Sequence, residues 1–214
     1  MKGSTNKLSA HLGLLIFCLF VALPAQAMNI DVFSTGVDAS GMPLTPGTMD
    51  SHWLVDGNPT YAADAGLGFP TWAQQNTAGA SWIATTPNVP YIDNIASFVY
   101  MQTFDLTGLD LSTVVFNGLL STDDGGELFL NGVSTGLLTP TNQWALPAVV
   151  FDLTGANFIA GVNTLSVRVD NIGGPTGLFL EITEATAAPI PEPSTILLFG
   201  SGLAGLAAWR YRKK

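Results

Sequence analysis

Few residues between Met28 and Ile190 could do acid–base or metal chemistry. This stretch contains no cysteine, no lysine and one histidine, His52. A hydrolytic triad would need His52 as its base. Asp50 and Ser51 precede it, but adjacent residues of a strand point to opposite faces. One histidine without cysteine also supplies too few of the ligands that zinc prefers. We therefore interpret His52 as a half-buried strand residue beside Trp53, and we expect no enzymatic activity.

Carboxylates are the remaining reactive groups. Asp123 and Asp124 are adjacent in a glycine-rich segment. A paired-carboxylate glycan hydrolase is a remote alternative, because turn chemistry explains two adjacent aspartates more simply. Calcium prefers six to eight oxygen ligands, and Asp123, Asp124 and Asp170 are candidate ligands for a structural ion. Solvated turn carboxylates are the simpler interpretation, so we assign no metal site and expect no other cofactor.

Aromatic side chains give the sharper binding hypothesis. Trp72 and Trp144 lie in apparent loops, where an exposed ring could stack on a pyranose. Trp53 and Trp82 lie in predicted strands, where packing between sheets is the better interpretation. We therefore take Trp72 and Trp144 as candidate ligand-stacking residues, with burial in the core as an equal alternative.

The elements that must position these residues are short strands separated by Gly, Pro, Asn and Asp. Leu165, Val167 and Val169 alternate with polar residues, as one buried face requires, and Leu178, Leu180 and Ile182 repeat the pattern. Asn131-Gly132 is typical of a type I′ turn. Strands are predicted at 29–33, 52–55, 81–84, 97–105, 113–120, 127–130, 148–152, 164–169 and 177–183. This pattern predicts an all-β protein with a two-sheet sandwich over residues 28–184.

The predicted domain is strongly acidic. Arg168 is the only basic residue between Met28 and Ile190. The same stretch contains fifteen acidic residues, so its net charge is −14. Such a surface repels nucleic acid, and we exclude DNA or RNA as a partner. Residues 185–190 are small and contain proline, and we expect them to form a short linker.

Both ends read as processing segments. Residues 1–27 combine Lys2 and Lys7, an apolar stretch and Ala25-Gln26-Ala27, which predicts a signal-peptide helix for Sec export with cleavage before Met28. Residues 194–209 are apolar and predict a single transmembrane helix of ~24 Å, short for a bilayer core of ~30 Å. The basic residues Arg210, Arg212, Lys213 and Lys214 form a membrane stop that favours a cytoplasmic C-terminus.

The tail also carries a family resemblance. Pro191-Glu192-Pro193-Ser194-Thr195, the apolar run and the basic end closely resemble the PEP-CTERM sorting signal of exosortase substrates over about residues 189–214. The resemblance implies that an exosortase-family membrane protease recognises Pro191, Glu192 and Pro193 and cuts near them. It also implies a producer that forms biofilm or exopolysaccharide. The protein would first be anchored in the inner membrane with its ectodomain outside, and would then reach the cell surface or the extracellular space.

A second resemblance covers roughly residues 30–185. The phrases Asp123-Asp124-Gly125-Gly126 through Leu130-Asn131-Gly132-Val133 and Gly161-Val162-Asn163-Thr164-Leu165 look like galactose-binding-like jelly rolls of exported bacterial proteins. The resemblance implies a jelly-roll β-sandwich and carries no catalytic residue. We expect a binding module whose ligand is a carbohydrate or exopolysaccharide. The alternatives are a purely structural matrix protein and, remotely, a glycan hydrolase.

Overall fold

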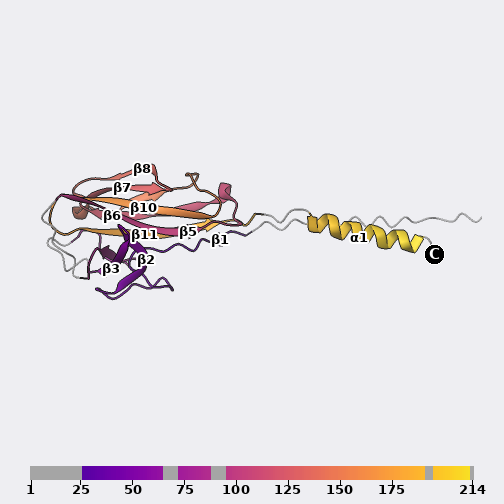
Figure 1. Cartoon of the computed structure of the whole chain (residues 1–214), viewed down its shortest axis with the longest axis horizontal. Coiled ribbons are helices and arrows are strands. Elements are labelled where there is room, and N and C mark those ends of the chain that lie inside the picture. Colours follow the sequence, from indigo (N-terminus) through magenta and orange to yellow (C-terminus); the bar gives the residue numbers. More distant parts are fainter. Residues whose placement is uncertain (1–25, 65–71, 88–94, 191–194, 213–214) are drawn as a thin grey trace, which may run out of the picture.

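A computed structural model describes residues 26–64, 72–87, 95–190 and 195–212. The described chain is mostly β-strand, followed by one C-terminal helix (Figure 1). The strands are β1 (Met28–Asn29), β2 (Met49–Val55), β3 (Asn58–Ala63), β4 (Trp82–Ala84), β5 (Ala96–Asp105), β6 (Val115–Asp123), β7 (Gly125–Leu130), β8 (Val133–Thr139), β9 (Val149–Asp152), β10 (Val162–Asn171) and β11 (Gly177–Ala187). Two 3-10 turns, Leu111–Thr113 and Gln143–Ala145, and the helix α1 (Thr195–Arg212) complete the elements. The all-β prediction for the domain is confirmed.

The strands join into one antiparallel, barrel-like sheet. Its order is β8-β7-β10-β5-β2-β3-β4-β11-β6-β9, and β1 pairs with β11. The longest pairings join β10 to β5 and β11 to β6. These two pairs lie in different halves of the sheet, and the β2–β3 connection links the halves. The sheet therefore curves over one core, and β8 and β9 are the two ends of this strand order.

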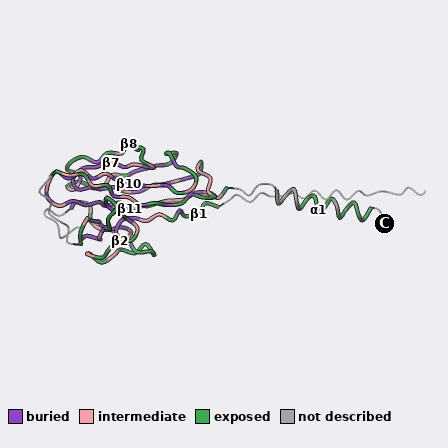
Figure 2. Tube along the Cα trace, in the orientation of Figure 1, coloured by how far each residue is buried: buried purple, intermediate pink, exposed green. Residues whose placement is uncertain are grey.

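The core lies between the two halves, and buried residues occur along strands of both halves (Figure 2). Leu165, Val167 and Val169 of β10 are fully buried, which confirms the predicted alternation in that strand. Across the core they meet side chains from the other half, among them Phe116 of β6 and Leu180 of β11. Burial of these apolar side chains supplies the main driving force for folding, because this cysteine-free domain has no cross-links.

Each of the nine predicted strands overlaps an observed strand, but two observed strands were not predicted. β3 contains Pro59 and two alanines, which weaken the strand signal. β8 has Gly136 with φ 79° at its centre and a register shift against β7. The turn prediction is confirmed, because Asn131 and Gly132 have φ values of 54° and 74° between β7 and β8.

β11 is covered on both faces, which the sequence pattern did not predict. Leu178 and Leu180 face the main core as expected, but Phe179 is also fully buried. Phe179 belongs to a second apolar cluster with Trp72 and Trp82, on the other side of the sheet. The segment that carries Trp72 and Ala80 therefore adds a cover over the second half of the sheet.

The predicted linker at 185–190 is part of the folded domain. β11 continues to Ala187, which is fully buried. Beyond it, Ala188 N donates to Thr113 Oγ1 at 2.8 Å, and its carbonyl accepts from Asp110 N at 2.8 Å. Ile190 N donates to Gly108 O at 2.8 Å. We call this set of bonds between residues 188–190 and the 108–113 turn the C-terminal clasp.

The chain enters and leaves the domain at the same end. Met28 pairs with Ala187, and the C-terminal clasp lies next to this pair (Figure 1). The helix α1 runs from Thr195 to Arg212. In the parts of the chain that the structure describes, helices fall short of the length and apolar character that a bilayer crossing needs. The predicted crossing by residues 194–209 is therefore not confirmed, and the predicted signal peptide lies mostly outside the described residues.

Candidate functional site

Trp72 is not the exposed ring that the loop interpretation allowed. Its side chain is 1% exposed and stacks on Trp82, with 4.0 Å between ring centroids and 26° between planes. Its Nε1 donates to Asp123 Oδ2 at 2.6 Å. Trp144 lies in the 143–145 turn, is half-buried, and packs against the same cluster. The two candidates therefore lie in one cluster, with Trp72 fully buried and Trp144 half-buried, and do not form an open stacking pair.

Asp123 and Asp124 are buried rather than solvated. They are 5% and 4% exposed, at the junction of β6 and β7. Asp124 Oδ2 accepts from Ile172 N at 2.7 Å, and Asp123 O accepts from Thr176 Oγ1 at 3.0 Å. Burial raises the pKa of Asp123 to about 7; the bond from Trp72 acts against this rise, and the neighbouring Asp124 charge adds to it. Burial also raises the pKa of Asp124.

His52 and Asp50 are brought together, contrary to the expectation that strand geometry separates His52 from the residues before it. They are two residues apart in β2, and His52 Nδ1 lies 3.5 Å from Asp50 Oδ1. The imidazole stacks on Phe33, with centroids 3.7 Å apart. Asp50 accepts from Gly36 N at 2.7 Å and from His52 N at 2.8 Å. Burial raises the pKa of Asp50, and these bonds act against the rise. The pair ties the 33–37 segment to β2.

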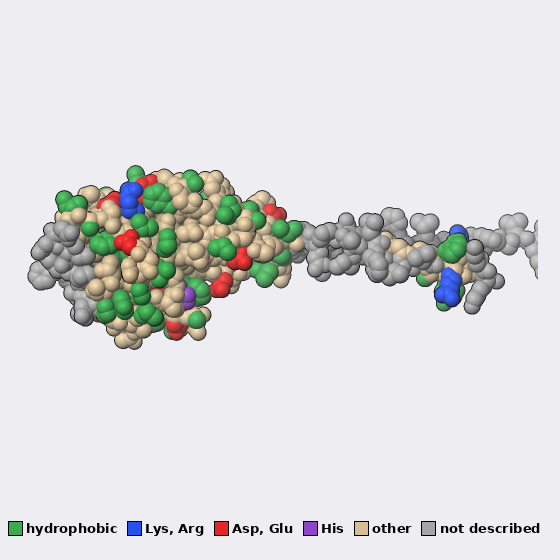
Figure 3. Space-filling model, viewed as in Figure 1, with side chains coloured by type: hydrophobic (Ala, Val, Ile, Leu, Met, Phe, Trp, Pro, Cys, Tyr) green, Lys and Arg blue, Asp and Glu red, His purple; other side chains and the backbone are tan. Residues whose placement is uncertain are grey.

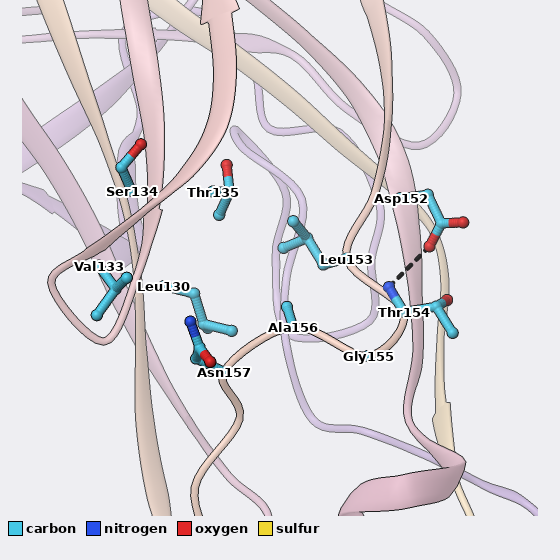
Figure 4. A pocket seen from close by; sticks show the side chains of 10 residues that line it. All are labelled: Leu130, Val133, Ser134, Thr135, Asp152, Leu153, Thr154, Gly155, Ala156 and Asn157. Atoms are coloured by element: carbon cyan, nitrogen blue, oxygen red, sulfur yellow. Dashed lines mark hydrogen bonds between the residues drawn. The ribbon is translucent and has the colours of Figure 1, made fainter.

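A polar hollow of about 220 Å³ lies between the β7–β8 turn and the segment after β9 (Figure 4). Its polar lining consists of Ser134, Thr135, Asp152, Thr154 and Asn157. Thr154 N donates to Asp152 Oδ1 at 2.7 Å, which holds that carboxylate at the rim. The lining has hydroxyl, carboxylate and amide groups but no aromatic ring. The hollow could therefore bind a polar ligand through hydrogen bonds, but it offers no aromatic ring for stacking.

The acidic residues of the described segments do not gather into a metal site. No group of three or more His, Asp or Glu side chains there could hold a metal ion. Asp170 instead accepts from Ser97 Oγ at 2.7 Å and from Arg168 Nε at 3.1 Å. Arg168 also lies 3.2 Å from Glu127. Each of the three calcium candidates thus has protein partners of its own.

The C-terminal tail, residues 189–213, is the part of the chain that matches a known sequence motif. Arg210 and Arg212 lie in the last turn of α1 and are exposed. Pro191, Glu192, Pro193, Lys213 and Lys214 lie outside the described residues. Residues 189–213 match the PEP-CTERM protein-sorting motif. This motif indicates export, a C-terminal membrane anchor before processing, and processing by an exosortase.

No curated protein matches the chain. Among solved structures, the chain is similar to the GH31 alpha-xylosidase from Xanthomonas citri at 10% sequence identity and a TM-score of 0.29. The similarity covers 79% of this chain and 19% of that protein, so the chain spans about a fifth of its length.

One buried polar side chain with many hydrogen bonds, that of Asn163, was not singled out in the sequence. Asn163 is fully buried, and its amide makes four hydrogen bonds. Its Oδ1 accepts from Ile159 N and Asn131 Nδ2, and its Nδ2 donates to Ile159 O and Gly161 O, all within 2.7–2.9 Å. The sequence Gly161-Val162-Asn163-Thr164 could have indicated this role. It places an asparagine at the start of a strand, where a buried amide needs hydrogen-bond partners.

Proposed function

We propose that this protein is an exosortase substrate whose β domain is displayed at the cell surface or in the extracellular matrix. The observation that carries the proposal is the match of residues 189–213 to the sorting motif, placed where the folded domain ends at Ile190. A domain that ends at the processing motif can be released intact when the tail is removed.

The finer route extends this proposal. Residues 1–27 direct Sec export, and residues 194–209 hold the chain in the inner membrane with the domain outside. The basic residues at 210 and beyond stay on the cytoplasmic side, as positive charges favour. The domain is a galactose-binding-like jelly roll, a proposal supported by the barrel-like antiparallel sheet and by the quoted sequence phrases.

The domain itself acts as a structural matrix module without enzymatic activity. Burial of Asp123 and Asp124 supports this, because a hydrolase needs two carboxylates open to substrate. The stacking of His52 on Phe33 supports it too, since the ring packs against a neighbour in the fold. Burial of Trp72 removes one of the two rings on which sugar stacking rested.

Carbohydrate binding at the polar hollow is our second proposal. The hydroxyl, carboxylate and amide groups of Ser134, Thr154, Asp152 and Asn157 suit a saccharide that is held by hydrogen bonds. Without an aromatic platform, such binding would be weak. The ligand class would be the host's own exopolysaccharide.

Intact-mass analysis of the protein from its native host tests the main proposal. We expect a species that lacks residues 1–27 and the residues after a cut beyond Ile190, in the membrane-free fraction. A host without its exosortase should retain the tail and keep the protein in the membrane. A full-length species in the cytosol of both hosts would refute the proposal.

Polysaccharide pull-down with the purified domain tests the second candidate. Binding that is lost in Thr154→Ala combined with Asn157→Ala, and kept in the matched Trp144→Phe variant, would assign it to the polar hollow. Equal capture of both variants would mean that the polysaccharide binds outside the hollow. No capture of the folded domain would favour the structural role.

A further inference from the structure

The domain and the anchor are joined by very little chain. The C-terminal clasp holds the chain down to Ile190, and α1 begins at Thr195. Five Cα–Cα steps therefore separate the last clasped residue from the helix. At about 3.3–3.6 Å per residue, they span at most ~18 Å. Whatever the direction of α1, the end of the domain that carries Ile190 cannot move further than this from the start of the helix.

This end of the domain is built from four adjacent segments. Leu109 bridges Pro189, and Met28 pairs with Ala187. Leu106 N donates to Gly161 O at 2.9 Å, which joins the turn that follows β5 to the segment before β10. We call the surface formed by Met28 and residues 105–113, 159–162 and 188–190 the anchor-proximal face.

The anchor-proximal face exposes apolar side chains. They are Met28, Ile159, Val162 and Ile190, each 50–62% exposed. Hydrophobic and acidic side chains gather at the end of the body from which the tail leaves (Figure 3). Scattered single apolar residues need no explanation, but here they share one face with the exit of a membrane-anchored segment.

Two acidic residues on this face remain charged. Asp105 accepts from Thr107 Oγ1 at 2.7 Å, and Asp110 accepts from Ser112 Oγ at 2.7 Å. These bonds lower the pKa of both carboxyls. A negative rim favours neutral, zwitterionic headgroups over anionic ones.

We infer that the anchor-proximal face rests on the lipid headgroup layer while the protein is anchored, with Met28, Ile159, Val162 and Ile190 in contact with lipid. The inference rests on the C-terminal membrane anchor of the proposed function. The short tether keeps the anchor-proximal face close to the membrane surface. Burial of its exposed apolar side chains in the lipid interface then favours contact. A sorting protease would then have to act in a gap of at most ~18 Å beneath a folded domain.

The two ends of β10 provide a matched test. Val162 begins the strand and Ile172 follows it, and their side chains are 62% and 57% exposed. Ten residues of strand separate these ends by about 30 Å. Cys18 is the only cysteine, so Val162→Cys and Ile172→Cys can each carry one fluorophore in the full chain with Cys18→Ala.

The labelled chains are reconstituted into phosphatidylcholine vesicles that contain a headgroup spin-labelled lipid. We expect the label at position 162 to lose fluorescence and the label at 172 to keep it. If the chain floats with the vesicles but both labels are quenched equally, or the label at 162 is not quenched, the lipid contact is refuted and the anchor is not. A chain that does not float with vesicles would overturn the anchor as well.

A longer tether separates contact from mere proximity. A flexible Gly/Ser insertion of about 20 residues after Ile190 adds a span of ~25 Å. If the apolar side chains hold the face on lipid, position 162 stays quenched in this chain. A fall to the level of position 172 would show that the tether alone kept the face near, and would overturn the contact.

Discussion

Trp72 Nε1 donates to Asp123 Oδ2 at 2.6 Å, and this bond joins the cover over β11 to the end of β6. Both side chains are buried, so each satisfies a polar group that water does not reach. The bond links residues 51 positions apart in the sequence. The sequence suggested two separate roles, a ligand-stacking ring for Trp72 and a solvated turn carboxylate for Asp123. In the structure the two side chains form one buried contact.

Trp72→Phe should destabilise the domain by about 2–4 kcal/mol. Phenylalanine keeps an aromatic ring against Trp82 but leaves the Asp123 carboxyl without its donor, and it fills less volume. Chemical denaturation measures the change. Trp144→Phe is the matched control, because Trp144 is half-buried and should cost under ~1 kcal/mol. Similar losses in the two variants would contradict the role given to the Trp72–Asp123 bond.

The stability of the domain should fall as pH rises from 4 to 7. The pKa of Asp123 is about 7 in the folded protein and about 3.8 in the unfolded chain. Between these values the folded state keeps a proton that the unfolded state has lost, so its stabilisation is complete below pH 3.8 and is lost as pH rises through 7. The expected loss is roughly 2–4 kcal/mol, because a tenfold change in proton affinity is worth about 1.4 kcal/mol.

Asp123→Asn tests the origin of this dependence. Asparagine keeps an acceptor for Trp72 but does not titrate, so the unfolding free energy should change less between pH 4 and 7. Some slope should remain, because burial also raises the pKa values of Asp50 and Asp124. An unchanged slope, measured by urea unfolding across this range, would assign the effect to other groups.

Asn163→Ala should cost roughly 3–5 kcal/mol. The substitution removes the four hydrogen bonds of a fully buried amide, which hold Ile159, Gly161 and Asn131 together at the start of β10. Thermal unfolding reports the loss as a lower Tm. Asn58→Ala is the control, since Asn58 is exposed and donates only one 3.2 Å bond to Asp56 O. A loss below 1 kcal/mol for Asn163→Ala would show that water replaces the amide.

Thr113→Val should loosen the C-terminal clasp at a cost of about 1 kcal/mol. It removes the acceptor of the Ala188 amide, so hydrogen exchange at Ala188 and Ile190 should become faster. Ser112→Ala removes only a bond to Asp110 within the same turn and should leave that exchange unchanged. Equal exchange in the two variants would mean that the Thr113 hydroxyl does not hold the chain at Ala188.

The strand pattern was predictable wherever one face of a strand is buried. The period of two in 164–169 fixes which side chains of β10 face the core, and Asn131-Gly132 fixes the turn after β7. Prediction was wrong where a local signal was weak or was overridden. β3 has a proline and small residues, and Phe179 is buried because a distant segment covers it. Residues 185–190 were predicted to be a short linker, because the local sequence does not show that residues 188–190 bond to the distant 108–113 turn.

The sequence by itself determined the all-β class, the acidic surface and the sorting motif at 189–213, because each depends on local composition or spacing. Only the tertiary structure decided that Trp72 and Asp123 are buried together, that Asn163 closes a bond network, and that the domain extends to Ile190. These features depend on contacts between segments that lie far apart along the chain. The burial of a ring or a carboxyl follows from what the fold brings over it, which no local pattern encodes.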